Sequence, residues 1–288
     1  MQQVPSIYHH QVGEITVTAI CDGYLDTNYE IFHGITPEEG DAHMRSAYLQ
    51  SPPRISVNSY LVRSKGRIAL IEAGAGHTMG ATLGFLPAHL AAAGVNINDI
   101  ETVLLTHMHP DHSNGLTDAD GSRVFPASEI ALADAEMRHW QDDSAMAAAP
   151  ERKRERYFRA AREQLRAYGD QLRPFTGTGE VFPGITPVPS AGHTPGHTAY
   201  LVADGDDSLL IWGDTVHVPH IQIRFPHVTL DFDSDEAAAA AMRRRLLEIA
   251  VTEETLVGGM HLDFPGFGHI GREDDGYRFF AAPWNPIL

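Results

Sequence analysis

Three histidines and one aspartate fall within six residues, at His107, His109, Asp111 and His112. They directly follow the apolar, β-branched run 101–105, which predicts a buried strand. His107 and His109 are two residues apart and therefore lie on one face of an extended strand end. The proline that follows ends the strand, so the next aspartate and histidine point in another direction. The alternative is a histidine-rich surface turn, but such a turn would need neither a preceding buried strand nor this regular spacing. These imidazole and carboxylate groups predict two positions for zinc or a neighbouring first-row metal.

The pattern His-x-His-x-Asp-His resembles the signature of the metallo-β-lactamase superfamily. That superfamily completes its site with a lone histidine, then an aspartate and then a late histidine, each at the end of its own strand. The chain has candidates for all three in this order, at His193, Asp214 and His261. The resemblance implies an α/β (α+β) fold, the αββα sandwich. Residues 1–288 would form a single domain, in which two βα halves, about 14–175 and 176–288, pack their sheets face to face.

The resemblance implies a role for each ligand, assigned by matching the motifs of the superfamily to this sequence. One metal would take His107, His109 and His193, the other Asp111, His112 and His261, and Asp214 would bridge both. Two divalent metal ions are expected, with zinc as the first choice and manganese, iron or cobalt as alternatives. Two ions about 3.5–4 Å apart can share a hydroxide and make it a nucleophile at neutral pH. Asp111 and Asp214 are the expected catalytic residues, and no serine or cysteine nucleophile is needed.

Residues outside the general motif are similar to the methyl parathion hydrolase-like branch, which also includes lactonases. These are the stretches 212–217, 225–235 and 261–270. We therefore predict hydrolysis of an acyl-homoserine lactone-like lactone or an ester, with promiscuous phosphotriesterase activity. A primary organophosphate triesterase, a glyoxalase II-like thioesterase and a β-lactamase stay open as alternatives. Oxygen-reducing diiron relatives are disfavoured, because they typically have an acidic residue where this chain has His109. A structural metal centre usually has four ligands, fewer than the seven expected here.

Four residues near these motifs have two open interpretations each. Glu72 stands where the superfamily usually has aspartate, and it either orients the metal ligands from behind or merely caps a turn. His197 either supports the ligands or is structural. His217 and His220 follow the expected bridging aspartate, and they either line the pocket or lie on the surface as ordinary histidines.

Composition limits the classes of partner. The 288 residues include 21 basic and 38 acidic side chains, and the resulting net charge of −17 argues against binding a nucleic-acid backbone. A small-molecule substrate is expected instead, and a homodimer is compatible with the sequence. The single cysteine, Cys21, excludes an intrachain disulfide and is expected to be a buried residue near a strand end. The N-terminus has no signal-peptide pattern and no segment has the length of a membrane span, so we expect a soluble, cytoplasmic protein without membrane contact.

Local patterns predict the elements that must position these residues. Strands are expected at 14–21, 56–62 and 67–72, around 185, at 200–202 and at 209–212. Helices are expected at 78–93, at 130–140 after an N-cap at Ser128, over about 150–168, and at 235–251 after an N-cap at Ser234. The segment after the turn signal Asp22-Gly23, up to Pro53, has no long periodic run and is expected to be a surface excursion.

Overall fold

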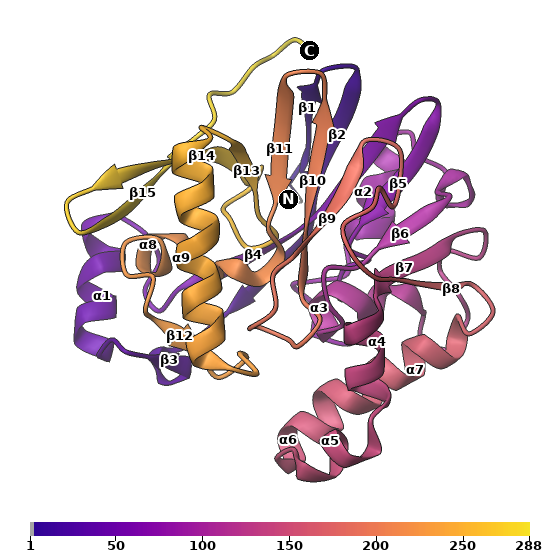
Figure 1. The fold of residues 1–288 in the computed structure, drawn as a ribbon, viewed down its shortest axis with the longest axis horizontal. Helices are drawn as coiled ribbons and strands as arrows, with labels where there is room; N and C mark the ends of the chain where they lie inside the picture. The colour runs from indigo at the N-terminus through magenta and orange to yellow at the C-terminus, as the bar shows by residue number, and fades with distance from the viewer. Residues whose placement is uncertain (1–2) are drawn as a thin grey trace.

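Two β-sheets face each other in the computed structural model, which describes residues 3–288 (Figure 1). The first sheet contains, in spatial order, β1 (Ile7–Val12), β2 (Ile15–Asp26), β4 (Arg54–Ser64), β5 (Arg67–Ile71), β6 (Thr102–Leu104), β7 (Glu129–Ala133) and β8 (Leu172–Phe175). Neighbours from β1 to β5 are antiparallel, and those from β5 to β8 are parallel. The parallel strands end at one edge, which is where the first ligand loop leaves the sheet.

The second sheet is formed by the later part of the chain. Its spatial order is β15 (Gly276–Ala281), β14 (Phe267–Glu273), β13 (Leu256–Gly258), β11 (Asp207–Ile211), β10 (Thr198–Asp204) and β9 (Ile185–Pro189). Only the β11 and β13 neighbours are parallel among these described strands. A small separate ribbon pairs β3 (Phe32–His33) with β12 (Thr229–Leu230).

The layer between the sheets is apolar. Val17, Tyr60 and Ile71 of the first sheet pack there against Tyr200 and Ile211 of the second. Successive side chains of a strand point to opposite faces, so one sheet can contribute to the central layer and to an outer layer at once. Burial of these side chains is the main force that holds the two sheets together.

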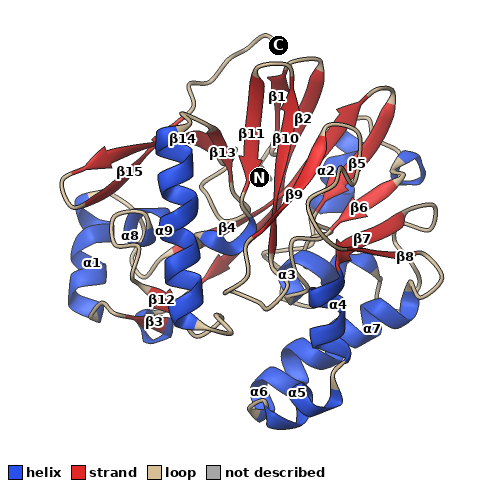
Figure 2. Ribbon diagram, in the orientation of Figure 1, coloured by secondary structure: helices blue, strands red, loops and turns tan. Residues whose placement is uncertain are grey.

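Helices cover the outer faces of both sheets (Figure 2). On the first sheet lie α2 (Leu86–Ala92), α4 (Asp134–Gln141) and α7 (Arg159–Ala167), and on the second lies α9 (Glu236–Thr252). The order of layers is therefore helix, sheet, sheet, helix, and the predicted αββα sandwich is confirmed. The division into halves at about residue 175 stays a prediction.

Shorter elements connect these layers. They are α1 (Pro37–Ser46), α3 (Pro110–Ser113), α5 (Asp143–Ala148), α6 (Glu151–Lys153) and α8 (Pro219–Gln222), the π-helical segment η4 (Arg154–Phe158), and the 3-10 turns η1 (Tyr29–Ile31), η2 (Ile97–Asp99), η3 (Asn114–Leu116) and η5 (Gly213–Thr215). The elements α6, η4 and α7 follow one another without a break, as predicted for the helix over about 150–168. No helix within residues 3–288 is both long and apolar enough to cross a membrane.

Two predicted helices are wrong at their start. The helix expected at 78–93 is limited to α2, because Gly80 and Gly84 have left-handed backbone angles and Pro87 fits only the first turn. The helix expected at 130–140 begins only at Asp134, since residues 129–133 form β7 in the middle of the parallel sheet. Ser128 therefore caps no helix, and its hydroxyl donates to the carbonyl of Ile100.

Two smaller expectations also need correction, and one hairpin has no counterpart among the predicted elements. The segment 24–53 is more than a surface excursion, because it contains α1, which starts with a capping box between Thr36 and Glu39. The N-cap of α9 is Asp235 and not Ser234, because the Asp235 carboxylate accepts from the amide of Ala238. The hairpin of β14 and β15 was not predicted at all.

Candidate metal centre

The structure brings all seven predicted ligands together where loops of the two sheets meet. His107 follows β6 and, with His109, leads into the short helix α3, which contains Asp111 and His112. The other three residues follow strands of the second sheet: His193 after β9, Asp214 after β11 and His261 after β13. Six of the seven side chains are buried and Asp111 is partly buried. Their role as metal ligands stays a prediction.

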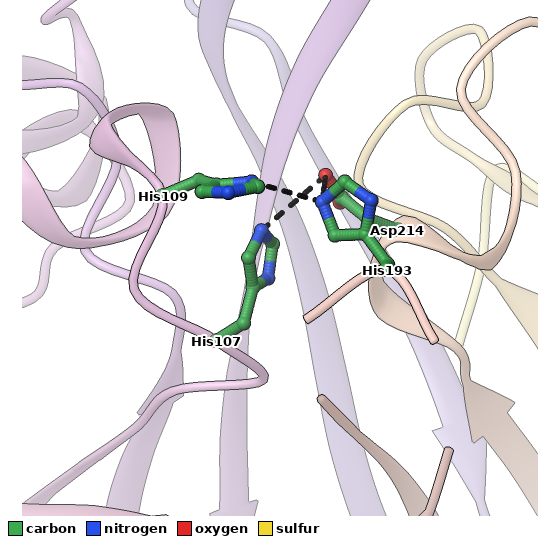
Figure 3. Close-up of side chains that lie close together, drawn as sticks. All are labelled: His107, His109, His193 and Asp214. Atoms are coloured by element: carbon green, nitrogen blue, oxygen red, sulfur yellow. Dashed lines mark hydrogen bonds and ion pairs between the residues drawn. The ribbon is translucent and has the colours of Figure 1, made fainter. Parts of the chain in front are cut away.

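One group of ligand atoms surrounds a single oxygen of Asp214 (Figure 3). Asp214 Oδ2 lies 3.2 Å from His193 Nε2 and 3.5 Å from His107 Nε2. His109 Nδ1 lies 2.9 Å from His193 Nε2. Two of these histidines come from the first sheet and one from the second, so the group exists only where the sheets meet.

A second group lies at the other oxygen of the same carboxylate. Asp214 Oδ1 is 3.1 Å from His112 Nε2 and 3.2 Å from His261 Nε2. Asp111 Oδ2 completes this group at 3.5 Å from His112 and 3.6 Å from His261. Each oxygen of Asp214 thus faces a different group, an arrangement in which one carboxylate can bridge two metal ions.

The outward nitrogens of two of these histidines are held by acceptors. His193 Nδ1 donates to Asp233 Oδ1 at 2.8 Å, and His261 Nδ1 donates to the carbonyl of Ser56 at 2.8 Å. Histidines that bind metals are typically fixed in this way, because the outer bond selects the tautomer whose inner nitrogen has a free lone pair.

The electrostatics of the cluster favour a cation at its centre. Burial alone would raise the pKa of the Asp214 carboxyl, but the imidazoles of His112, His261 and His107 hold that pKa well below its usual range. Burial and the neighbouring His112 lower the pKa of His107 well below the ordinary value, so His107 is neutral at physiological pH. Asp214 and His107 thus have the ionisation states that bind metal, an anionic carboxylate and a neutral imidazole. Against the effect of burial, Asp214 raises the pKa of His112 and His261, and that of His193 to about 9, so these three imidazoles would release protons when metal binds.

The residues present fit a divalent metal. Among the described residues, His107 Nε2, His112 Nε2, His261 Nε2 and Asp214 Oδ1 are buried without a hydrogen-bond partner. Buried polar atoms in native proteins nearly always have a partner, and here the orphaned atoms converge on the same small space. Nitrogen and carboxylate donors of this kind suit zinc and its first-row neighbours.

The structure favours a supporting role for Glu72 and His197. Glu72 is buried, accepts from the amide of Thr106 at 3.0 Å and lies 3.6 Å from His112 Nδ1. His197 Nε2 accepts from the amide of Asp214 at 2.9 Å, and burial lowers the pKa of His197 to about 3. His197 therefore fixes the backbone of Asp214 from behind, whereas Glu72 lies behind His112 without a hydrogen bond to it. His220 lies outside the cluster, 3.5 Å from Asp263.

His217 lies in the cluster itself. Its Nε2 is 3.0 Å from Asp214 Oδ2, its ring stacks on His261 at 5.1 Å, and it lines the hollow beside the ligands. Of its two interpretations, pocket lining is therefore the one that the structure supports. Its spacing three residues after Asp214 was the available sequence signal.

Sequence reasoning missed Glu136, a fully buried carboxylate at the start of α4. Its Oε1 accepts from the amide of Met108 at 2.9 Å and from the indole of Trp140 at 2.6 Å. Its Oε2 accepts from the Thr194 hydroxyl at 2.6 Å and from the amide of Gly196 at 3.1 Å. Met108 lies between the candidate ligands His107 and His109, and Thr194 directly follows His193. Glu136 therefore connects the loops of both sheets that contain the candidate ligands through hydrogen bonds.

A narrow hollow of about 50 Å³ opens beside the ligands. Its walls are mostly apolar and include Leu25, Ile55, Met79, Tyr157 and Phe232, and the exposed Arg156 lies at its rim. An adjoining hollow of about 260 Å³ shares the walls of Tyr157 and Phe232 and continues along α5. Apart from the candidate ligands and from Pro110 and His217 in their loops, these walls come from segments distinct from the ligand loops.

The chain is similar in sequence to known proteins. Two proteins described as probable metallo-hydrolases, from Mycobacterium bovis and Mycobacterium tuberculosis, are each 31% identical over 147 residues. That match covers 46% of this chain and 44% of each relative, so it spans less than half of their length.

Solved structures match over nearly the whole chain. The crystal structure of the hydrolase AbOPH of the beta lactamase superfamily has a TM-score of 0.93 and 27% identity, and the match covers 99% of this chain and 100% of that one. AidC, described as a dizinc quorum-quenching lactonase, has a TM-score of 0.92 at 23% identity with the same coverage. The family model described as the metallo-beta-lactamase superfamily matches residues 52–261. The chain therefore belongs to the metallo-beta-lactamase superfamily.

Proposed function

We propose that this protein is a dinuclear metal-dependent hydrolase whose preferred substrates are uncharged lactones with an apolar tail. The observation that carries the proposal is the position of Asp214, whose two oxygens each face a separate group of ligand atoms. Zinc is the first expectation for both ions, because the donors are imidazole nitrogens and carboxylate oxygens. When bound, the two ions would activate water at neutral pH and polarise the carbonyl under attack.

The residues of the chain have separate tasks in this proposal. His107, His109 and His193 would hold one ion, and Asp111, His112 and His261 the other, with Asp214 shared. Asp233 and the Ser56 carbonyl fix two of the imidazole rings, so the ligands need little rearrangement on binding. Leu25, Ile55 and Phe232 line the space beside the ligands, so a substrate bound against them would displace water and strengthen electrostatic interactions there.

The walls of the site support a neutral substrate with an apolar tail. The hollow beside the ligands is lined mainly by apolar side chains, and its extension along α5 is lined by Ala145, Ala148 and Phe158 among others. A tail placed there would gain the usual free energy of apolar burial. AidC, which shares the fold, is described in complex with the product N-hexanoyl-L-homoserine, so acyl-homoserine lactones are the first substrates to test. Phosphotriesterase activity is proposed as secondary.

Two measurements test the proposal. Elemental analysis of the purified protein should give two metal ions per chain, and Asp214→Ala should lose at least one of them. The kcat/KM of metal-loaded protein should be higher on acyl-homoserine lactones than on paraoxon-type triesters, a glutathione thioester and a β-lactam. One tightly bound ion, with no activity gained on adding more, would exclude the dinuclear site. If the thioester or the β-lactam were hydrolysed fastest, the lactone preference would be excluded, whereas the assignment of the metal site would stand.

A further inference from the structure

A second and larger cavity, of about 500 Å³, lies on the opposite side of a strand pair that borders the metal centre. In β2 and β4, Leu25 pairs with Ile55 and Tyr24 pairs with Ser56. Leu25 and Ile55 line the hollow beside the ligands, whereas Tyr24 and Ser56 line the second cavity. This division follows from the two-residue period of strands, which places neighbouring side chains on opposite faces. One two-stranded ribbon thus separates two spaces.

The walls of the second cavity are mainly apolar and come from segments far apart in the sequence. They include Val4, Met44, Leu49, Phe85, Val218 and Phe264. Small-molecule sites typically have volumes of about 300–1,000 Å³ and a predominantly hydrophobic lining with a few polar groups. This half-open cavity of about 500 Å³, bordered by so many segments, has the size of such a site.

The charged side chains at this cavity have partners within the protein. Arg54 forms two hydrogen bonds with Asp26, at 2.8 and 3.0 Å, and its guanidinium lies 3.6 Å above the ring of Tyr24. His220 lies 3.5 Å from Asp263. A charged ligand would have to compete with these internal partners and would lose its hydration on entering an apolar space. The charge pattern therefore favours an uncharged ligand.

Polar groups gather at one wall of the cavity. The Cys21 thiol lies 3.3 Å from the Gly23 carbonyl and 3.8 Å from the Ser56 hydroxyl. His89 Nδ1 donates to the Cys21 carbonyl at 2.7 Å, which leaves its Nε2 as an acceptor. We propose that this cavity is a second binding site, for an uncharged and largely apolar small molecule with one hydrogen-bonding group.

The proposed site is joined to the metal centre through one residue. The Ser56 side chain lines the cavity, and its carbonyl accepts from His261 Nδ1 at 2.8 Å. A ligand that shifts β4 at this point would move the acceptor that orients His261. The site goes beyond the proposed hydrolase function, because its existence depends only on the walls of the cavity.

Binding of the neutral fluorescent probe N-phenyl-1-naphthylamine to the metal-loaded protein tests the site. Saturable fluorescence enhancement is expected. Cys21→Phe places a bulky ring in part of the cavity and Leu49→Glu places a charge on its apolar wall, so each should weaken binding about tenfold or more. Tyr48→Ala is the matched control, because Tyr48 is next to Leu49 yet is 99% exposed and does not line the cavity. This control and Asp214→Ala should change the dissociation constant less than about twofold.

The native thiol gives a second measurement that needs no variant. Cys21 is the only cysteine of the chain and lies at the cavity wall, so the bound probe should slow its alkylation by N-ethylmaleimide. Unchanged alkylation at saturating probe, or equal probe binding by Cys21→Phe, would overturn the proposal. Loss of probe binding in Asp214→Ala would assign the probe to the metal centre instead. A dimer that excludes the probe, and that Leu49→Glu converts to a monomer, would show that the cavity is a subunit interface.

Discussion

Glu136→Gln should destabilise the fold strongly although it changes the size of the side chain very little. In the native protein both carboxylate oxygens accept two hydrogen bonds, Oε1 from Met108 and Trp140 and Oε2 from Thr194 and Gly196. An amide has a single acceptor oxygen, and its NH2 group would face two donors. One of the two pairs of donors is then left without an acceptor in a fully buried environment.

The expected loss follows from the hydrogen bonds removed. Burial raises the pKa of Glu136, and the hydrogen bonds from Thr194, Trp140 and two backbone amides act against this rise. These four donors therefore compensate the buried charge. Each hydrogen bond to a charged group contributes about 1.5–3 kcal/mol, so losing two should cost about 3 kcal/mol or more. Thr194→Val is the control, because it keeps the shape, removes one donor and should cost about 1.5–3 kcal/mol.

Urea unfolding in the presence of a chelator is the appropriate assay, since bound metal would itself stabilise the folded state. The free energy of unfolding should fall in the order wild type, Thr194→Val, Glu136→Gln. A Glu136→Gln protein within about 0.5 kcal/mol of the wild type, the range of ordinary surface substitutions, would refute the reasoning.

Three further predictions concern other residues. Gly196→Ala should lower Tm markedly and Gly179→Ala should not, because an added Cβ would lie 2.1 Å from the Glu136 backbone nitrogen in the first case and has open space in the second; equal Tm values would contradict this. Asp214→Ala should abolish turnover, whereas His217→Ala should keep two metal ions and part of the activity, as elemental analysis and kinetics will show. Burial raises the pKa of Cys21, so less of the reactive thiolate exists at a given pH, and its alkylation rate should rise at higher pH than that of glutathione.

The sequence was most informative where spacing is local. His107, His109, Asp111 and His112 form a contiguous pattern, and the strand before them can be recognised from its apolar residues. Glu136 has no such signal. Its partners Met108 and Thr194 lie in loops of different sheets, and only the folded chain brings them to one carboxylate.

The misassigned helices have a related cause. Residues 130–133 are apolar in succession, and a buried strand and a buried helix are hard to distinguish over so short a run. Their place as β7 is decided by neighbouring strands that come from 102–104 and 172–175. The two readings of Glu72 were likewise undecidable from sequence, because the contact with the Thr106 amide spans two loops.

The side chains that line the hollow and the candidate metal ligands lie mostly in different segments of the chain. Leu25, Met79, Tyr157 and Phe232 line the hollow from four segments that contain none of the candidate ligands. Insertions, deletions or substitutions in these segments can change which molecules enter while the hydrolytic chemistry is preserved. A lineage with this architecture can therefore move between substrates in a few mutational steps. Directed evolution of the protein should diversify these four segments and leave the ligand loops unchanged.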